Sequence, residues 1–579
     1  MVHDILWSRV GRHQRWCLNN LQSGRLLSLD PRTTWSECLL VDLDHLFIRT
    51  TTEGDILGSN HGQTPPRASL RRSAGIIFFF AVLSKLGGLI RQFTMALVFG
   101  TSATNDAWLI ASLIPNLFFG AISGAISVTT VPLLAEADAR YSPESTNVFI
   151  NQAFAAISVI VLGLSIFAEV YTPILTRWVA PGFNPHELRL TIQMARVVMP
   201  TLWFQAIGGF FSGILQEREQ YSAPAAIPVF INVIRIVGIL ALSQYMGIMG
   251  VAVGFTIATI MQLVLLIAPL HRARIRLYLV GSFDHPLLKT MGRMSLPYFI
   301  NVSVNSIEII VDRILSSYLV TGSIAAINYS YTLVQVPITM LLGPITTPLL
   351  TRLSQQHSQG EHQAFRQTAL RGFELTLFVL APVTVWFVTL RIPILVIIFQ
   401  HGAFSSRSTQ LTARTLLAFG LGIPGFGITF YLKNLFFASK DTRVPARYGI
   451  IAIACNVAGD LTLVHLWQAA GLSLSTSIAN WINATLLIRN LLRKNILNLQ
   501  AFKTTLIPLL MASGAMLALW VLAHIFISPL HLGTWALMGW TLSQVVLSGL
   551  IYLAIVRQMN HPGYEMAMDV VKSRLAKKL

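Results

Sequence analysis

The residues that could do chemistry in this chain are ionisable side chains inside long apolar segments. Lys85 and Arg91 fall in the apolar stretch 73–98, and Asp106 stands at the start of the next one, 105–134. A charge at the centre of a membrane span costs roughly 2.5–3.5 kcal/mol, so such side chains usually face a cavity or a partner. Six residues correspond to about 600° of helix rotation, which puts the two cations on different faces. At least one cation is expected to point inwards, although Arg91 could instead reach the headgroups and Asp106 could act on a helix dipole.

A second group of polar residues lies in later apolar segments. Glu308 and Asp312 are four residues apart and share one helical face, with Arg313 beside them as a neutralising charge. Asn456 and Asp460 have the same spacing. The segment after them begins with four hydroxyl groups, those of Ser473, Ser475, Thr476 and Ser477. Carboxylate, amide and hydroxyl oxygens are the ligands of hard cations, so the pattern predicts a cation site; hydrogen bonds that only hold helices together are the alternative.

Motifs of common soluble enzymes are missing from the sequence. No lysine follows a glycine, so the chain has no phosphate-binding P-loop. It also has no HExxH and no GxSxG, and Cys17, Cys38 and Cys455 lack the CxxC spacing of a metal or redox site. We therefore expect a protein that is not an enzyme, has no catalytic residue and no resident cofactor, with Na⁺ as the candidate coupling ion.

The composition indicates a membrane protein. Of the 579 residues, 54% are hydrophobic and 11% are charged, and the mean hydropathy is +0.62, whereas soluble domains carry about 25% charged residues. The apolar residues form blocks of about the length that spans a bilayer. We read fourteen such segments: 73–98, 105–134, 147–172, 190–215, 224–244, 247–270, 290–318, 324–351, 372–390, 409–438, 446–466, 470–490, 504–526 and 534–556. The expected fold class is an all-α polytopic membrane protein of about 14 transmembrane helices.

An internal repeat divides these segments. Val131-Pro132-Leu133-Leu134 recurs as Thr347-Pro348-Leu349-Leu350, and other short motifs recur in the same order at similar spacing. Because six helices is an even number, we expect two parallel six-helix lobes followed by two further helices. The expected divisions are a soluble, flexible extension at 1–72, an N-lobe at 73–283, a C-lobe at 284–500, two helices at 501–558 and a basic cytoplasmic tail at 559–579.

The basic residues predict the orientation in the membrane. Lys and Arg concentrate in alternate loops, for example Arg272, Arg274, Arg276, Lys289 and Arg293 in one of them. Such residues are retained on the cytoplasmic side, so both termini are expected in the cytoplasm. The net charge of +18 is explained by this topology, and no nucleic-acid partner is expected.

Several short motifs together carry a resemblance to a known family. They are Ser84-Lys85-Leu86-Gly87-Gly88-Leu89-Ile90-Arg91, Asn105-Asp106-Ala107, Ile114-Pro115-Asn116, Val131-Pro132, Ala180-Pro181-Gly182-Phe183 and Gly402-Ala403-Phe404. Over residues 73–556 the chain resembles the MurJ/MviN-type lipid II flippases of the multidrug/oligosaccharidyl-lipid/polysaccharide exporter superfamily. It departs from them where the family carries arginines, at Phe119-Gly120 and near Thr332.

The resemblance implies a function and a set of site residues. It implies alternating access, in which two lobes rock about a central cavity that takes the head of lipid II. The substrate would be bound by Ser84, Lys85, Arg91 and Asp106. Sodium would be held by Asp312, Asn456, Asp460, Thr476 and the carbonyl of Leu472.

The leading hypothesis is a flippase that moves a polyprenyl-pyrophosphate-linked peptidoglycan precursor, lipid II, across the cytoplasmic (inner) membrane. Transport would be coupled to sodium or to the membrane potential. The alternatives are a drug/cation antiporter or a polysaccharide-lipid flippase of the same superfamily, and a membrane scaffold that transports nothing. The expected partners are the lipid-linked substrate and membrane lipids, and the protein is expected to be a monomer.

Overall fold

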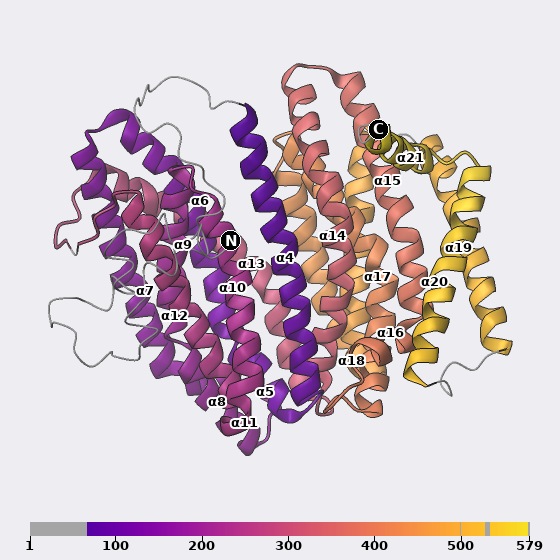
Figure 1. Cartoon of the computed structure of the whole chain (residues 1–579), viewed down its shortest axis with the longest axis horizontal. Coiled ribbons are helices and arrows are strands. Elements are labelled where there is room, and N and C mark those ends of the chain that lie inside the picture. Colours follow the sequence, from indigo (N-terminus) through magenta and orange to yellow (C-terminus); the bar gives the residue numbers. More distant parts are fainter. Residues whose placement is uncertain (1–66, 279, 498, 527–532, 577–579) are drawn as a thin grey trace, which may run out of the picture. The chain divides into compact units, whose positions relative to one another are not determined.

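The structure is a computed structural model that describes residues 67–576, apart from 279, 498 and 527–532. The described residues form helices joined by short connections, and no strand occurs among them (Figure 1). The predicted all-α fold is therefore confirmed. Most of the predicted extension, residues 1–66, lies outside the described part of the chain.

The first half of the fold comprises the helices before residue 273. They are α4 (Arg67–Phe99), α5 (Ala103–Ala111), α6 (Leu113–Arg140), α7 (Pro143–Val179), α8 (Pro185–Val198), α9 (Thr201–Glu217), α10 (Ser222–Val237), the π-helical turn η3 (Gly238–Leu242), α11 (Ser243–Met246) and α12 (Met249–Arg272). Several predicted segments consist of two pieces, such as α5 with α6 and α8 with α9.

The second half begins at residue 286. It comprises α13 (Pro286–Ser317), α14 (Ser323–Ser358), α15 (His362–Thr389), α16 (Arg391–Ile398), α17 (Ser406–Ala438) and α18 (Arg443–Arg493). Three helices follow: α19 (Leu499–Phe526), α20 (Thr534–Gln558) and α21 (Pro562–Ala576). The helix α18 contains two of the predicted segments, separated by a kink at Gln468 with φ 50° and ψ −128°.

Twelve helical segments among the described residues are long and apolar enough to cross a membrane. Counted in this way, α18 is one segment, and α13 is not among the twelve. A multi-pass membrane protein is thus confirmed, and the number of fourteen spans stays a prediction.

The break between α8 and α9 shows how the sequence bends a helix inside the membrane. Pro200 has no N–H to continue the helical hydrogen bonds, and carbonyl groups before it need other donors. The Thr201 hydroxyl donates to the Val198 carbonyl oxygen over 2.5 Å. The Thr256 hydroxyl on α12 donates to the Val197 carbonyl oxygen over 2.9 Å. Hydroxyl groups therefore supply hydrogen bonds to carbonyl oxygens near the break, and the hydroxyl on α12 links the break to a neighbouring helix.

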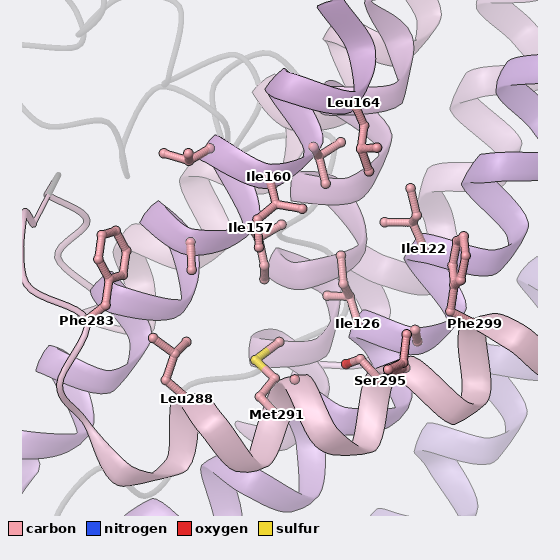
Figure 2. A pocket seen from close by; sticks show the side chains of 16 residues that line it. Ile122, Ile126, Ile157, Ile160, Leu164, Phe283, Leu288, Met291, Ser295 and Phe299 are labelled. Atoms are coloured by element: carbon pink, nitrogen blue, oxygen red, sulfur yellow. The ribbon is translucent and has the colours of Figure 1, made fainter. Parts of the chain in front are cut away.

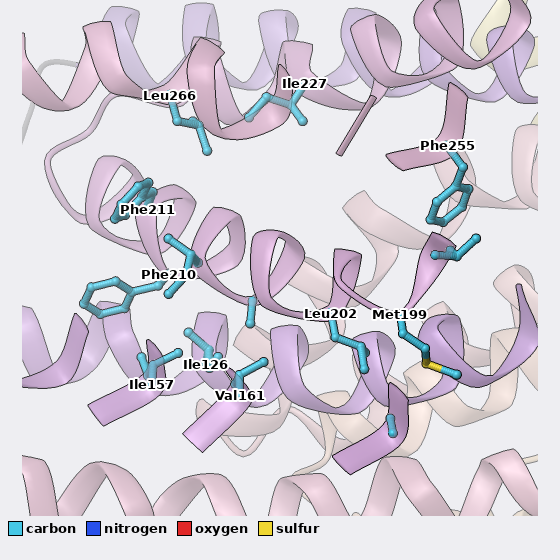
Figure 3. Close-up of a cluster of buried hydrophobic side chains, with 14 of the residues drawn as sticks. Ile126, Ile157, Val161, Met199, Leu202, Phe210, Phe211, Ile227, Phe255 and Leu266 are labelled. Carbon is cyan, nitrogen blue, oxygen red and sulfur yellow. The ribbon is translucent and has the colours of Figure 1, made fainter. Parts of the chain in front are cut away.

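Buried apolar side chains divide between the two halves. Most of those in the first half form one core, which includes residues between 95 and 291 (Figure 3). The second half and the last three helices contain two cores, with residues mostly between 325 and 472 and between 353 and 556. Leu287, in the first turn of α13, packs in the first core. Since α13 also contacts α14 and α18, this helix connects the two halves.

Large apolar side chains on the outside of the bundle fit a lipid environment. On α7, Val159 is 65% and Val170 is 67% exposed, and Trp535 at the start of α20 is 83% exposed. A soluble protein seldom exposes apolar patches of this extent. These faces are therefore the ones that we expect to meet lipid.

The predicted basic tail contains a helix that packs on the bundle. Its residue His561, just before α21, is fully buried and stacks on Phe378 of α15. The His561 Nδ1 accepts a hydrogen bond from the Gly563 N–H over 3.0 Å. Burial lowers the pKa of His561 to about 4. Neutral His561 is therefore part of the contact that holds α21 against α15.

We expect α21 to come loose in mild acid. An exposed histidine has a pKa of about 6.5, so between about pH 6.5 and pH 4 the released form takes up a proton that the packed form excludes. The packed state is fully stable above this window and loses stability as the pH falls through it. Hydrogen exchange of residues 562–576 should accelerate from pH 7 to pH 5, and His561→Asn should remove this dependence. Equal pH dependence in both proteins would contradict the account.

Candidate functional site

The predicted substrate residues on α4 lie on two sides of that helix. The Ser84 carbonyl oxygen accepts a hydrogen bond from the side chain of Asn232 on α10 over 3.2 Å. One turn on, a Cβ at Gly87 would stand 3.2 Å from the Asn232 Cβ, so α4 and α10 approach closely there. The Lys85 side chain is exposed, whereas that of Arg91 is partly buried. The structure therefore does not bring Lys85 and Arg91 together on one face.

The guanidinium group of Arg91 points into the protein without a carboxylate partner among the described residues. Its Nε is buried and makes no hydrogen bond. It interacts electrostatically with Tyr329 of α14. The Tyr329 hydroxyl is already engaged, because it accepts from the Asn105 side chain over 2.8 Å and donates to the Gly100 carbonyl oxygen over 3.2 Å. Arg91 thus keeps hydrogen-bonding capacity for a ligand.

Asp106 connects the two halves of the fold. Its Oδ2 accepts from the Gly322 N–H over 2.6 Å, and its Oδ1 accepts from the Ala325 N–H over 2.8 Å. These N–H groups belong to the N-terminus of α14, where a negative charge is favoured by the helix dipole. The Asp106 side chain is 5% exposed, so the structure gives it a capping role. Its predicted part in substrate binding is not tested by this arrangement.

Further contacts surround Asp106, and together we call them the junction: residues 97–106, 317–325 and 403–408. The Ala403 N–H donates to the Leu97 carbonyl oxygen over 2.8 Å, and the Thr101 hydroxyl donates to the Ser408 hydroxyl over 2.8 Å. Gly322 has φ 93°, and a Cβ there would collide with the Thr101 carbonyl oxygen. The two halves therefore meet at the junction through both main-chain and side-chain hydrogen bonds.

The predicted cation ligands on α18 lie side by side across its kink. Asn456, Asp460 and Leu472 are at most 1% exposed. We orient the Asn456 side-chain amide so that both its oxygen and its nitrogen have hydrogen-bond partners. The oxygen then accepts from the Thr476 N–H over 3.1 Å, and the nitrogen donates to Glu308 Oε1 over 3.2 Å. The Thr476 hydroxyl donates to the Leu472 carbonyl oxygen over 3.1 Å. The kink thus gathers oxygen atoms from both parts of α18.

The acidic residues of α13 complete this group, which we call the carboxylate cluster: Glu308, Asp312, Asn456, Asp460 and Thr476. The Asp312 and Asp460 side chains lie within hydrogen-bonding reach of each other, and Asp312 Oδ1 is buried without a partner. Two carboxylates this close cannot both stay charged unless a proton or a cation lies between them. Their oxygens, with the amide, hydroxyl and carbonyl oxygens around them, suit a hard monovalent cation. In the described residues, no group of three or more His, Cys, Asp or Glu is arranged for a metal ion.

Two cations near these sites were missed from the sequence. Arg235 on α10 interacts electrostatically with Arg91, and Lys433 on α17 does so with Glu308. Ser475, one of the four hydroxyl residues singled out in the sequence, donates to the Asn456 carbonyl oxygen over 2.7 Å. Like Lys85 and Arg91, Arg235 and Lys433 are charged residues inside apolar segments, and this pattern could have identified them in the sequence. The pairing of each with its neighbour depends on the fold.

A cavity of about 700 Å³ opens between α6, α7 and α13, away from these polar groups (Figure 2). Its lining is apolar, with Ser295 as the one polar side chain. The Ser295 hydroxyl lies 3.3 Å from the Thr129 hydroxyl of α6. Such a lining suits a hydrocarbon chain and offers nothing to a phosphate group.

Comparison with known proteins identifies the family. Residues 95–542 match the family model described as lipid II flippase MurJ. The chain belongs to the MurJ family. Among MurJ relatives, the probable lipid II flippase of Rhizobium meliloti (strain 1021) is 29% identical over 445 residues, which cover 75% of this chain and 83% of the relative. That of Buchnera aphidicola subsp. Acyrthosiphon pisum (strain APS) is 27% identical over 432 residues, 73% and 84% of the two chains.

Solved structures agree with the MurJ fold. A lipid II flippase MurJ in an inward closed conformation has a TM-score of 0.72 and 23% identity, over 83% of this chain and 99% of that one. A multidrug resistance MATE transporter in an inward-facing conformation has a TM-score of 0.62 and 14% identity, over 71% and 94%. At these identities the likeness shows the fold alone.

Proposed function

We propose that this chain translocates lipid II across the cytoplasmic membrane by alternating access. The observation that carries the proposal is the match of residues 95–542 to the lipid II flippase family. The geometry supports it: two halves meet at the junction, and the buried Nε of Arg91 has no hydrogen-bond partner and can donate to an anion such as the diphosphate of the lipid head.

The proposed orientation puts both termini in the cytoplasm. In the junction, residues 97–106 and 317–325 contain no Lys and no Arg, and 403–408 contains Arg407 alone, whereas 272–276 contains three arginines. Cytoplasmic loops are the ones enriched in these residues. The junction then closes the outer end, and the substrate would enter from the cytoplasmic side.

Sodium is the coupling ion that we propose, held by Asp312, Asn456, Asp460, Thr476 and the Leu472 carbonyl. A bound cation would offset the burial of two neighbouring carboxylates. Asp312 lies on α13, which packs against α6 and α7 of the first half as well as against α18. Occupancy of the carboxylate cluster would therefore favour one arrangement of the two halves, which links ion binding to lipid binding.

A drug/cation antiporter is the second candidate, supported by the likeness to the MATE transporter fold. A site for organic cations needs acidic groups. Around Arg91 the structure instead places a second arginine, and the carboxylate of Asp106 is occupied by main-chain N–H groups. These charges favour an anionic substrate.

Complementation tests the proposal. A bacterium depleted of its own lipid II flippase should grow when this chain is expressed, provided that the protein is inserted in the membrane. Lack of growth despite normal membrane levels would contradict lipid II as the substrate.

The same strain tests the predicted cations. Arg91→Ala should fail to support growth, because it removes a buried donor that has no partner within the described part of the chain, and Lys85→Ala should fail if that exposed lysine also binds the diphosphate. Lys85→Arg should retain growth. An exposed arginine of α8, in the variant Arg196→Ala, is the control and should grow like the parent. Full growth of both the Lys85→Ala and the Arg91→Ala strains would remove these residues from the site.

A further inference from the structure

A single peptide unit near the start of α14 is held from both sides. The Arg313 Nη1 on α13 donates to the Ile324 carbonyl oxygen over 3.4 Å. The Ala325 N–H of the same peptide unit donates to Asp106 Oδ1 over 2.8 Å. The C=O and N–H of a trans peptide point in opposite directions, so the guanidinium group and the carboxylate lie at opposite edges of this unit. Each half of the fold therefore contributes one charged side chain to the same peptide.

The side chain of Ile324 places this peptide in the contact between the halves. It is 1% exposed and forms a small core with Ile110 of α5 and with Ala180, which follows α7. Both partners belong to the first half of the fold. The position of the peptide that Arg313 and Asp106 hold therefore decides whether Ile324 stays packed against the first half.

Arg313 lies on the side of α13 that faces the junction. The Ser317 hydroxyl, one turn further along α13, accepts from the Gly182 N–H of the first half over 3.0 Å. Residues four apart share one face of a helix, so Arg313 is turned the same way. Its guanidinium group interacts electrostatically with the carboxylates of Asp106 and Asp312. Its hydrogen bond goes to α14, however, and Asp312 Oδ1 is buried without a partner.

Charge balance explains why an arginine suits this place. Asp106 is 5% exposed, and a buried carboxylate destabilises a protein unless hydrogen bonds and an opposite charge compensate it. Two main-chain N–H groups supply the hydrogen bonds, and Arg313 supplies the charge. A cation at the carbonyl oxygen of a peptide also polarises the peptide and strengthens the hydrogen bond that its N–H donates. Arg313 and Asp106 therefore reinforce each other through the peptide between them.

We propose that Arg313 is a positioning residue for closure of the outer end: it fixes the 324–325 peptide for Asp106 and balances the charge of that carboxylate. The inference rests on the proposed alternating access and orientation, and it assigns closure to two opposite charges instead of to Asp106 alone. It also gives Arg313 a role outside the carboxylate cluster. Removal of the guanidinium group should therefore open the junction.

A cysteine at position 180 measures this opening. In a background without Cys17, Cys38 and Cys455, Ala180→Cys in the purified full chain should react slowly with a polar maleimide, because Ala180 is 1% exposed. Arg313→Met should accelerate the reaction about tenfold, the scale expected for a hydrogen bond from a charged donor. Arg313→Lys keeps the charge but not the planar guanidinium group, and it should react at an intermediate rate. A rate equal to that of the parent in both variants would overturn the proposal.

A double-mutant cycle tests whether the two charges act through one peptide. If they do, the second substitution has less to release once the first has been made. The variant with both Arg313→Met and Asp106→Ala should therefore react at least about threefold more slowly than the product of the two single accelerations predicts. An acceleration equal to that product would show that Arg313 acts independently of Asp106, against the proposal.

Two controls distinguish opening of the junction from general loosening of the fold. Arg391 on α16 also donates to a main-chain oxygen, that of Val388, over 2.6 Å, and Arg391→Met should react like the parent. Equal acceleration by Arg391→Met would contradict the proposal. Thermal melting should place the unfolding of Arg313→Met well above the labelling temperature. If Arg313→Met does not fold, Arg313→Lys tests the proposal alone, and a rate equal to that of the parent would overturn it.

Failure of this inference differs from failure of the proposed function. Complementation by the parent, together with unchanged labelling of Arg313→Met, would overturn the positioning role and leave lipid II transport standing. Accelerated labelling of Arg313→Met without complementation by the parent would support the positioning role and point to another substrate.

Discussion

Replacing Asp106 by alanine is expected to open the junction. The carboxylate holds two N–H groups at the N-terminus of α14, over 2.6 and 2.8 Å, from the other half of the fold. Loss of such a cap costs about 1–2 kcal/mol, which corresponds to about a 5- to 30-fold shift between closed and open arrangements. Transport should fall strongly, because the outer end no longer closes reliably.

Labelling of an engineered cysteine measures this opening. In a background without Cys17, Cys38 and Cys455, Thr101→Cys should react slowly with a membrane-impermeant maleimide, and Asp106→Ala should accelerate the reaction. Asp106→Asn keeps one acceptor and should be intermediate. The control is Glu144→Ala, which removes an acidic residue from the first turn of α7, far along the chain from the junction. Equal labelling rates in Asp106→Ala and Glu144→Ala would contradict the capping role.

Removing either carboxylate of the proposed sodium site should abolish stabilisation by sodium. A ligand that binds the folded protein alone adds about 1.4 kcal/mol of stability at ten times its dissociation constant. Asp312→Asn and Asp460→Asn keep the shape of each side chain and remove the charge that the cation would balance. Both variants should therefore lose the sodium-dependent rise in melting temperature.

The comparison is a melting curve in sodium chloride against choline chloride at equal ionic strength. Glu374→Gln is a matched control, since Glu374 is a buried carboxylate of α15 that contacts Thr505 instead of the carboxylate cluster. This variant should keep the sodium effect. A sodium effect that persists in both Asp variants would refute the site.

The helices could be predicted from the sequence because an apolar segment of membrane length must pair its own backbone N–H and C=O groups in a bilayer, and a helix does this. The breaks within them could be predicted only in part. Pro200 marks one break in the sequence, whereas the break at Ser112 between α5 and α6 has no proline at its centre. The tail was predicted from its charge, but the packing of α21 depends on burial of His561 against a distant helix.

The site could be predicted to different degrees for different residues. Asn456 and Asp460 are four residues apart, so their proximity follows from helix geometry alone. The approach of Asp312 came from resemblance to the family, and the structure places it beside Asp460. The partners of Asp106 are 216 and 219 residues away, and no local pattern reveals them. Arg235 belongs to no motif, and its electrostatic interaction with Arg91 depends on the fold.

Reconstituted lipid II translocation tests the central claim most directly. The purified chain would be placed in liposomes with fluorescent lipid II, and the exposure of the label to a membrane-impermeant quencher would be followed over time. In liposomes that contain the parent protein, labelled lipid II should become accessible to the quencher faster than in protein-free liposomes. The rate should be higher with a sodium gradient than with a choline gradient. The Arg91→Ala variant should remain at the protein-free rate. A parent that melts as a folded protein but moves lipid II no faster than protein-free liposomes would contradict the account.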